Sequence, residues 1–186
     1  MTVYERELKN YKKLNSIARQ DSVVMFGSTF AKDMPLGELK QNFEFDVNLY
    51  NRSFSDLSIF DAAELAKEVI KPINPSKVLI QLGETDLERG YKTIDEMCEA
   101  MEKLIAEIKS WDKHMEVVLV SIVDEEGILH PEELNRRIEK IAKANKCKYA
   151  DITAARTNEF PDAKAFSLLR SFMKNGMSFA DAFAYV

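Results

Sequence analysis

Cysteine and histidine are scarce in this 186-residue sequence, and no apolar run is long enough to span a bilayer. The two cysteines, Cys98 and Cys147, have no metal-ligand spacing, and we interpret them as reduced packing residues rather than as a disulfide. The first residues are charged from Glu5 onward and contain no apolar segment of the kind that a secretory signal needs. We therefore expect a cytoplasmic protein without a membrane span.

Basic residues are fewer than acidic ones. The sequence has 26 Lys and Arg residues and 31 Asp and Glu residues, which give a net charge of −5. No block of Lys and Arg alternates with aromatic side chains, which disfavours a nucleic acid or an anionic membrane as the partner. A small neutral or cationic partner fits this balance better. With 46% hydrophobic residues the chain can bury a sizeable core, and we expect one domain over residues 1–186.

Apolar runs and helical spacings alternate along the chain. A buried strand is predicted over 22–26, where an apolar run ends in Gly27-Ser28-Thr29 and leaves a hydroxyl side chain at its carboxyl end. Residues 43–50 alternate apolar and polar side chains, which predicts a half-buried strand near an edge of the sheet. A helix over 93–111 begins with Thr93 as its cap and Glu96 three places on. Similar patterns predict strands over 77–82, 115–123 and 148–152, an N-terminal packing helix over 1–20, helices over 57–70 and 131–145, and a helical tail over 162–186.

This alternation predicts an α/β fold, a three-layer α/β/α sandwich around a parallel, flavodoxin-like sheet of about five strands. In such a sheet the loops that follow the strands emerge on one side. Four loops then meet at a common crevice, and they comprise residues 27–29, 53–56, 83–86 and 124–130. Their acidic side chains could ligate Mg²⁺ or Ca²⁺, but without a fixed ligand spacing we interpret them as solvated loop carboxylates. These side chains are Asp56, Glu84, Asp86 and Asp124. We predict no metal and no cofactor.

The order of the sequence blocks at these loops carries a family resemblance. The blocks are Val-Val-Met-Phe-Gly-Ser-Thr-Phe over 23–30, Asn-Arg-Ser-Phe-Ser-Asp over 51–56, Val-Leu-Ile-Gln-Leu-Gly-Glu-Thr-Asp over 78–86, Leu-Asn-Arg-Arg-Ile over 134–138 and Tyr-Ala-Asp over 149–151. Together they resemble the SGNH, or GDSL-type, hydrolase family of esterases and lipases. The resemblance implies a serine nucleophile in the first block, with an oxyanion hole from its own amide, a glycine amide of the second block and an asparagine of the third. It also implies a histidine base three residues after an aspartate near the carboxyl terminus.

At nearly every position where the family has a functional side chain, this sequence has a different residue. Thr29 takes the nucleophile position, Asp56 or Ser55 takes the glycine position, and Thr85 takes the asparagine position. Thr29, Asp56 and Thr85 are therefore the oxyanion-hole positions, although a carboxylate at 56 would repel a developing oxyanion. The aspartate and histidine of the last block correspond to Asn175 and Ser178, which form a degenerate dyad.

Two histidines, His114 and His130, are available to replace the missing base. His114 lies between a predicted helix and the next strand, so we expect it at the end of the sheet opposite the crevice. His130 closes the loop after a predicted strand and is expected on the catalytic side, where it is either a base for Thr29 or a solvated capping residue beside Pro131.

Two functions follow from these substitutions. The first is an SGNH-like pseudoenzyme, a catalytically impaired protein that binds a small ligand in the crevice or a partner on its surface. The alternative is an active carboxylic ester hydrolase in which Thr29 attacks, His130 or a nearby carboxylate is the base, and Thr85 with backbone amides forms the oxyanion hole. The oligomeric state stays open, with a homo-oligomer as one alternative.

Overall fold

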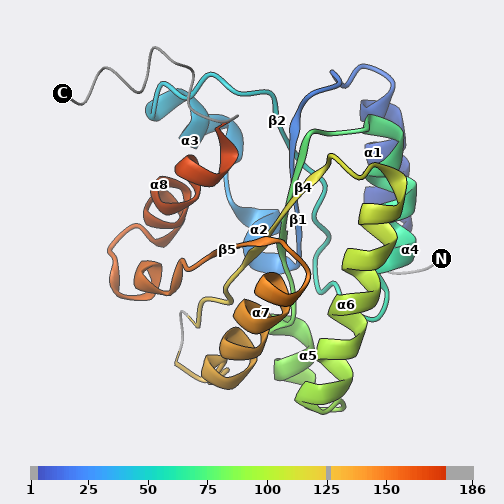
Figure 1. The fold of residues 1–186 in the computed structure, drawn as a ribbon. Coiled ribbons are helices and arrows are strands. Elements are labelled where there is room, and N and C mark those ends of the chain that lie inside the picture. Colours follow the sequence, from blue (N-terminus) through green and yellow to red (C-terminus); the bar gives the residue numbers. More distant parts are fainter. Residues whose placement is uncertain (1–3, 125–126, 175–186) are drawn as a thin grey trace.

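Five parallel strands form the central layer of the computed structural model, which describes residues 4–124 and 127–174 (Figure 1). The strands follow the order β2-β1-β3-β4-β5, which is the flavodoxin-like order. Their bounds are β1 Val23–Gly27, β2 Leu49–Asn51, β3 Lys77–Gln81, β4 Glu116–Val120 and β5 Lys148–Ala150. The predicted α/β architecture with a parallel five-stranded sheet is therefore confirmed.

Helices cover both faces of the sheet (Figure 1). One apolar core fills the space between the sheet and helices α1 Glu5–Asn15, α4 Ala62–Val69, α6 Ile94–Trp111 and α7 Glu132–Ala144. A second core lies under α2 Thr29–Asp33, α3 Leu36–Asn42 and α8 Pro161–Met173 on the other face. The short helix α5 Glu84–Arg89 follows β3, and the 3₁₀ turns span Lys71–Ile73 and Thr153–Thr157. None of the helices in the described ranges is long and apolar enough to cross a membrane.

The cap expected at the start of α6 is present. The Thr93 hydroxyl accepts the backbone N–H of Glu96 at 3.2 Å, and the Glu96 carboxylate accepts the backbone N–H of Thr93 at 2.9 Å. This reciprocal pair satisfies two backbone donors that the first turn of a helix leaves free.

The strand predicted over 43–50 is wrong except at its end, because only Leu49–Asn51 pairs with β1. The backbone of Phe45 instead donates to the carbonyl of Lys40 at 2.9 Å, which closes the end of α3. Phe43 and Phe45 both pack on Phe166 of α8, with ring centroids 5.4 and 5.8 Å away. The alternation of apolar and polar residues therefore belongs to an irregular segment that packs against a helix. That alternation alone did not distinguish the segment from a strand.

Several predicted helices are shorter than their patterns indicated. Of the N-terminal helix predicted over 1–20, residues 1–3 lie outside the described residues, and the helix itself spans Glu5–Asn15. The helix predicted over 57–70 begins only at Ala62. Ahead of it, the hydroxyl of Ser58 and the backbone N–H of Ile59 donate to the carboxylate of Asp86 at 2.6 and 2.9 Å. Asp86 thus holds this segment as a loop beside β3. The tail begins with α8 at Pro161, and residues 175–186 lie outside the described residues.

Candidate functional site

A pocket of about 460 Å³ lies at the carboxyl ends of the strands. This is the edge where an open α/β sheet binds its ligands, next to the point where the strand order reverses between β1 and β3. The pocket brings together residues from the loops after β1, β2, β3 and β4, with one further residue from α8. Its lining consists of Thr29, Phe30, Asp33, Asp56, Glu84, Thr85, Glu88, Val123, Asp124, Ile128, Leu129 and Asp162.

Thr29 is the first residue of α2, and its hydroxyl is held by Asp56. The backbone N–H of Asp56 donates to Thr29 Oγ1 at 3.0 Å, and Thr29 Oγ1 lies 3.4 Å from the Asp56 carboxylate, to which it donates. Asp56 has a φ of 54°, in the left-handed region that glycine adopts most readily. This backbone favours Asp56 over Ser55 as the counterpart of the glycine in the second block.

The hydroxyl of Thr85 forms a hydrogen bond with the neighbouring first block. It lies 2.7 Å from the hydroxyl of Ser28, and both side chains are buried. Either hydroxyl of this pair can be the donor, so the role of Thr85 as an oxyanion-hole donor stays a prediction.

Glu84 lines the pocket and is only 9% exposed. One carboxylate oxygen accepts the backbone N–H of Phe30 at 2.9 Å, and the other accepts the side-chain amide of Gln81 at 3.3 Å. Burial raises the pKa of Glu84 above its ordinary value, because the bonds from Phe30 and Gln81 offset only part of the cost of desolvation. The first residue of α5 therefore places a poorly solvated carboxyl group against α2, at the residue that follows Thr29.

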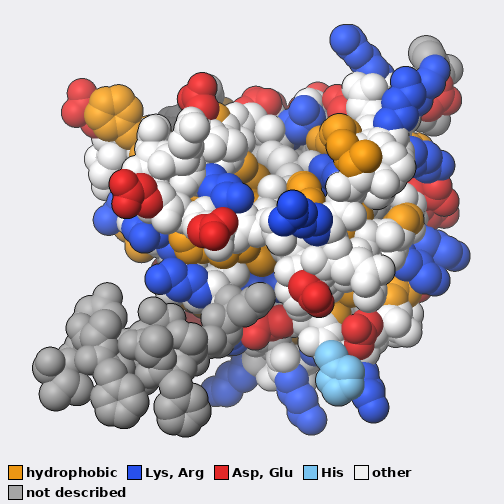
Figure 2. Space-filling model, turned by 90° about the horizontal axis from the view of Figure 1, so that it is seen from above, with side chains coloured by type: hydrophobic (Ala, Val, Ile, Leu, Met, Phe, Trp, Pro, Cys, Tyr) orange, Lys and Arg blue, Asp and Glu red, His pale blue; other side chains and the backbone are white. Residues whose placement is uncertain are grey.

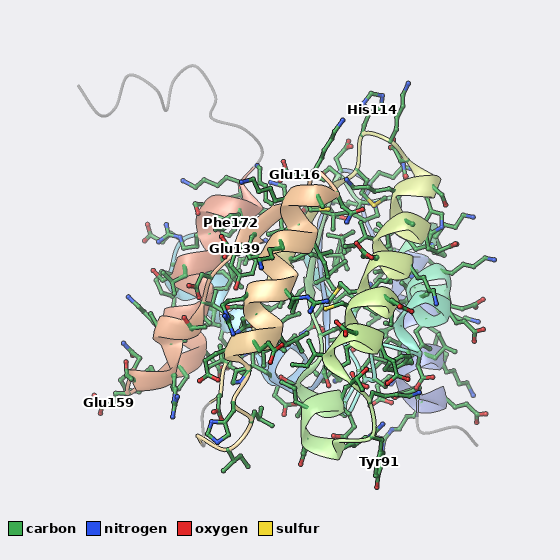
Figure 3. All side chains as sticks on the ribbon, turned by 60° about the horizontal axis from the view of Figure 1, so that its bottom comes forward. Tyr91, His114, Glu116, Glu139, Glu159 and Phe172 are labelled. Atoms are coloured by element: carbon green, nitrogen blue, oxygen red, sulfur yellow. The ribbon has the colours of Figure 1, made fainter. Side chains whose placement is uncertain are left out.

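Neither histidine approaches Thr29 as a hydrogen-bond partner. His130 is exposed, has a φ of 48°, and donates its backbone N–H to the Asp124 carboxylate at 3.4 Å. Its side chain is not among the residues that line the pocket. His114 lies at the amino ends of the strands, far from Tyr91 and Glu159 at the carboxyl end (Figure 3). The roles of Thr29 and His130 in catalysis stay predictions.

Three carboxylates of the pocket had no motif to mark them in the sequence: Asp33, Glu88 and Asp162. Asp33 ends α2, Glu88 lies on α5, and Asp162 is the second residue of α8, so only the fold brings them together. Burial, with a smaller contribution from the negative charge of Asp33, raises the pKa of Asp162. Within the described ranges, no three His, Cys, Asp or Glu side chains are close enough together to hold a metal ion.

The degenerate dyad, Asn175 and Ser178, lies outside the described residues. Helix α8 nevertheless fixes where that segment begins. Asp162, near the start of α8, lines the pocket, whereas the carbonyl of Lys174, just after the helix, accepts Lys77 Nζ at 2.8 Å. Because Lys77 is the first residue of β3, the chain has by then reached the amino end of the sheet.

The pocket is lined by charged groups of one sign, unlike the surface at the other end of the sheet. The face at the amino ends of the strands carries Lys and Arg side chains interspersed with Asp and Glu (Figure 2). The pocket at the carboxyl ends is lined by six carboxylates, and among the described lining residues there is no Lys, Arg or His.

No protein-family model matches the sequence, and no curated protein matches it. Solved structures do share its fold. A Streptococcus pneumoniae protein provisionally described as a platelet activating factor superposes with a TM-score of 0.78 at 15% identity, over 91% of this chain and 92% of that one. A GDSL-like lipase from Bacteroides thetaiotaomicron gives 0.69 at 17% identity, over 88% and 93%. Axe2, an acetylxylan esterase from Geobacillus stearothermophilus, gives 0.63 at 16% identity, over 83% and 94%.

These similarities establish that the chain has the SGNH-hydrolase fold that the sequence blocks indicated. Variants of Axe2 in which a serine or a histidine is replaced by alanine are described as catalytic mutants. In the present chain the position expected for the nucleophile is Thr29, and the hydrogen-bond partner of its hydroxyl is Asp56 rather than a histidine.

Proposed function

We propose that this chain uses the SGNH-hydrolase fold to bind a small molecule and that it does not hydrolyse esters. The observation that carries the proposal is the environment of the Thr29 hydroxyl. Its hydrogen bonds, among the described residues, are both to Asp56, and no imidazole takes part. A neutral hydroxyl is a weak nucleophile until a base removes its proton, so this threonine lacks the partner that acyl transfer requires.

The charge of the pocket also disfavours ester hydrolysis. Attack on an ester creates an oxyanion, which needs preorganised donors at the position where the charge develops. Here the Asp56 carboxylate lies beside Thr29, and the Glu84 carboxylate lines the same pocket and accepts the backbone N–H of the next residue, Phe30. Two like charges about 4 Å apart repel by about 1 to 4 kcal/mol, depending on how well water screens them. The carboxylates would therefore raise the activation barrier to ester hydrolysis, which the amide donors of an oxyanion hole would lower.

The alternative function is an esterase with a rebuilt site, and one contact favours it. The Asp56 carboxylate lies 3.4 Å from Thr29 Oγ1 and could accept its proton, while the Asp56 backbone N–H already points at the same oxygen. In that reaction Thr29 Oγ1 would bond to the acyl carbon, the alcohol would leave, and water would then release the acid.

A hydrolysis assay separates the two functions. With p-nitrophenyl acetate as substrate, we expect the wild-type protein and the Thr29→Ala variant to release p-nitrophenol at the same rate. That rate should not exceed the rate given by an equal concentration of heat-denatured protein. Turnover that disappears in Thr29→Ala, while the variant keeps the wild-type melting temperature, would establish the esterase and reject the proposal.

A further inference from the structure

A second cavity, of about 460 Å³, lies at the amino ends of the strands. Its wall is made by residues that precede β1 and β2 and by the end of α8, which lies beside α3 (Figure 1). The cavity is therefore at the opposite end of the sheet from Thr29. Its charged lining consists of two cations and three carboxylates: Arg170, Lys174, Asp21, Glu44 and Asp46.

Arg170 is held in this lining without an ionic partner. The guanidinium lies over the rings of Phe43 and Phe45, 5.2 and 5.7 Å from their centroids, and the side chain is half-buried. The Arg170 Nε–H is buried and has no hydrogen-bond acceptor, which is a costly arrangement in a folded protein. Stacking on aromatic rings fixes the plane of a guanidinium, whose fork of N–H donors matches a carboxylate. The internal packing thus orients an anion-binding group that the described chain does not use.

The carboxylates of the same cavity do not pair with Arg170. Within residues 4–124 and 127–174, neither Arg170 nor any of Asp21, Glu44 and Asp46 takes part in a salt bridge. Groups of opposite charge therefore line one cavity with a gap between them. A simple anion would be attracted by Arg170 but repelled by three carboxylates, and a simple cation would meet the guanidinium. A ligand that carries both charges satisfies both sides.

Apolar side chains complete the lining. Phe45 is buried and Val47 is half-buried, and both line the cavity. A cavity that combines a few fixed charges with hydrocarbon is suited to a small polar molecule that has an apolar part.

We propose that this cavity binds a free amino acid with an aliphatic side chain. Its carboxylate is held by Arg170, its ammonium group by the carboxylates of the same lining, and its side chain lies against Val47. The ammonium group brings three N–H donors to the acidic residues, and the carboxylate brings the acceptors that the guanidinium lacks. A metal ion does not fit this lining, since no three His, Cys, Asp or Glu side chains in the described ranges converge closely enough to hold one. This site is separate from the proposed function, because it uses none of the residues of the Thr29 pocket.

Calorimetric titration of the whole chain with L-leucine, at neutral pH and at two temperatures, tests the proposal. The comparison ligands are 4-methylpentanoate, which is leucine without its ammonium group, and 3-methylbutylamine, which is leucine without its carboxylate. We expect leucine to bind saturably and each comparison ligand to bind at least about 10-fold more weakly.

Variants place the site in the cavity. Arg170→Gln is expected to bind leucine at least about 10-fold more weakly than wild type. The matched control is Arg136→Gln, which removes the same charge from an exposed position on α7 and should bind leucine like wild type. The melting temperature of each variant establishes that it is folded.

The Asp21→Asn, Asp46→Asn double variant gives a readout that a loss of folding would not produce. It is expected to bind leucine about 10-fold more weakly and, because two repelling carboxylates are gone, to bind 4-methylpentanoate more tightly than wild type does.

The proposal is overturned if leucine gives no saturable heat at either temperature up to about 10 mM, or if either comparison ligand binds as tightly as leucine. Equal losses of affinity in Arg170→Gln and Arg136→Gln would also overturn it. Ester hydrolysis is measured separately at Thr29, so failure of this proposal and failure of the proposed function are distinguishable.

Discussion

The Gly27→Ala variant is expected to lose about 3 kcal/mol of its free energy of unfolding. Gly27 ends β1 and pairs with Gln81 of β3, and a Cβ atom there would lie 2.4 Å from the Gln81 carbonyl oxygen and 2.7 Å from Ala31 Cβ. Both neighbours are fixed, one as strand backbone and the other on α2, so the methyl group must push elements apart. The close approach permitted by glycine is therefore what brings the start of α2 and the start of α5 together at the pocket.

Gly37→Ala is the control for this prediction. Nothing lies within 4 Å of a Cβ at Gly37, which is an exposed position inside α3. Alanine is the better helix former by about 0.5 to 1 kcal/mol, so this variant should be slightly more stable than wild type. Chemical denaturation followed by circular dichroism measures both variants. A Gly27→Ala protein within about 1 kcal/mol of wild type would contradict the tight packing of β1 on β3.

The Glu84→Gln variant is expected to be more stable than wild type at neutral pH, by about 1 kcal/mol. The new amide can still accept the backbone N–H of Phe30, and its nitrogen can donate to the Gln81 carbonyl oxygen that has no partner at present. Burial raises the pKa of Glu84 in the folded state. Folding therefore favours the protonated form, and wild-type stability falls as the pH rises through that raised pKa.

The stability difference between Glu84→Gln and wild type is expected to depend on pH. Below about pH 4 the Glu84 carboxyl is protonated in both states, and the two proteins should differ least. The advantage of Glu84→Gln should then grow toward neutral pH as the buried carboxylate ionises. Glu88→Gln is the matched control, because Glu88 is an exposed carboxylate on the same helix and lines the same pocket. An advantage that is absent, or that does not change between pH 4 and pH 7, would contradict the account of Glu84.

Much of this fold could be predicted from the sequence. The buried strands β1, β3 and β4 each contain a continuous apolar run, which is typical of a parallel sheet covered on both faces. Helix α6 has an apolar stripe and a capping box at the same position. Local patterns and tertiary packing agree at these elements.

Prediction failed where local pattern and tertiary packing diverge. The alternation over 43–50 reflects two phenylalanines that pack on α8, and no local signal distinguishes that packing from a strand. Helix α5 was missed because it is six residues long and follows Gly83, whose φ of 118° turns the chain directly from β3 into the helix. Short helices set by a turn carry little periodicity.

The candidate site was accessible to sequence reasoning only in part. Thr29, Asp56 and Thr85 belong to blocks with a recognisable order, and all three line the pocket. Asp33 and Asp162 are separated by most of the chain and belong to no motif, so their proximity depends on the way α2 and α8 cover one face of the sheet. The acidic character of the pocket is therefore a property of the fold rather than of any one segment.

Labelling with a fluorophosphonate tests most directly whether the hydroxyl at the nucleophile position is inactive. Such a reagent phosphonylates an activated hydroxyl with loss of fluoride, and intact mass spectrometry detects the adduct without any knowledge of the natural substrate. We predict that the wild-type protein keeps its unmodified mass, like the Thr29→Ala variant treated in parallel. A single adduct on wild type that is absent from Thr29→Ala would contradict the account, because it would demonstrate an activated nucleophile in the pocket.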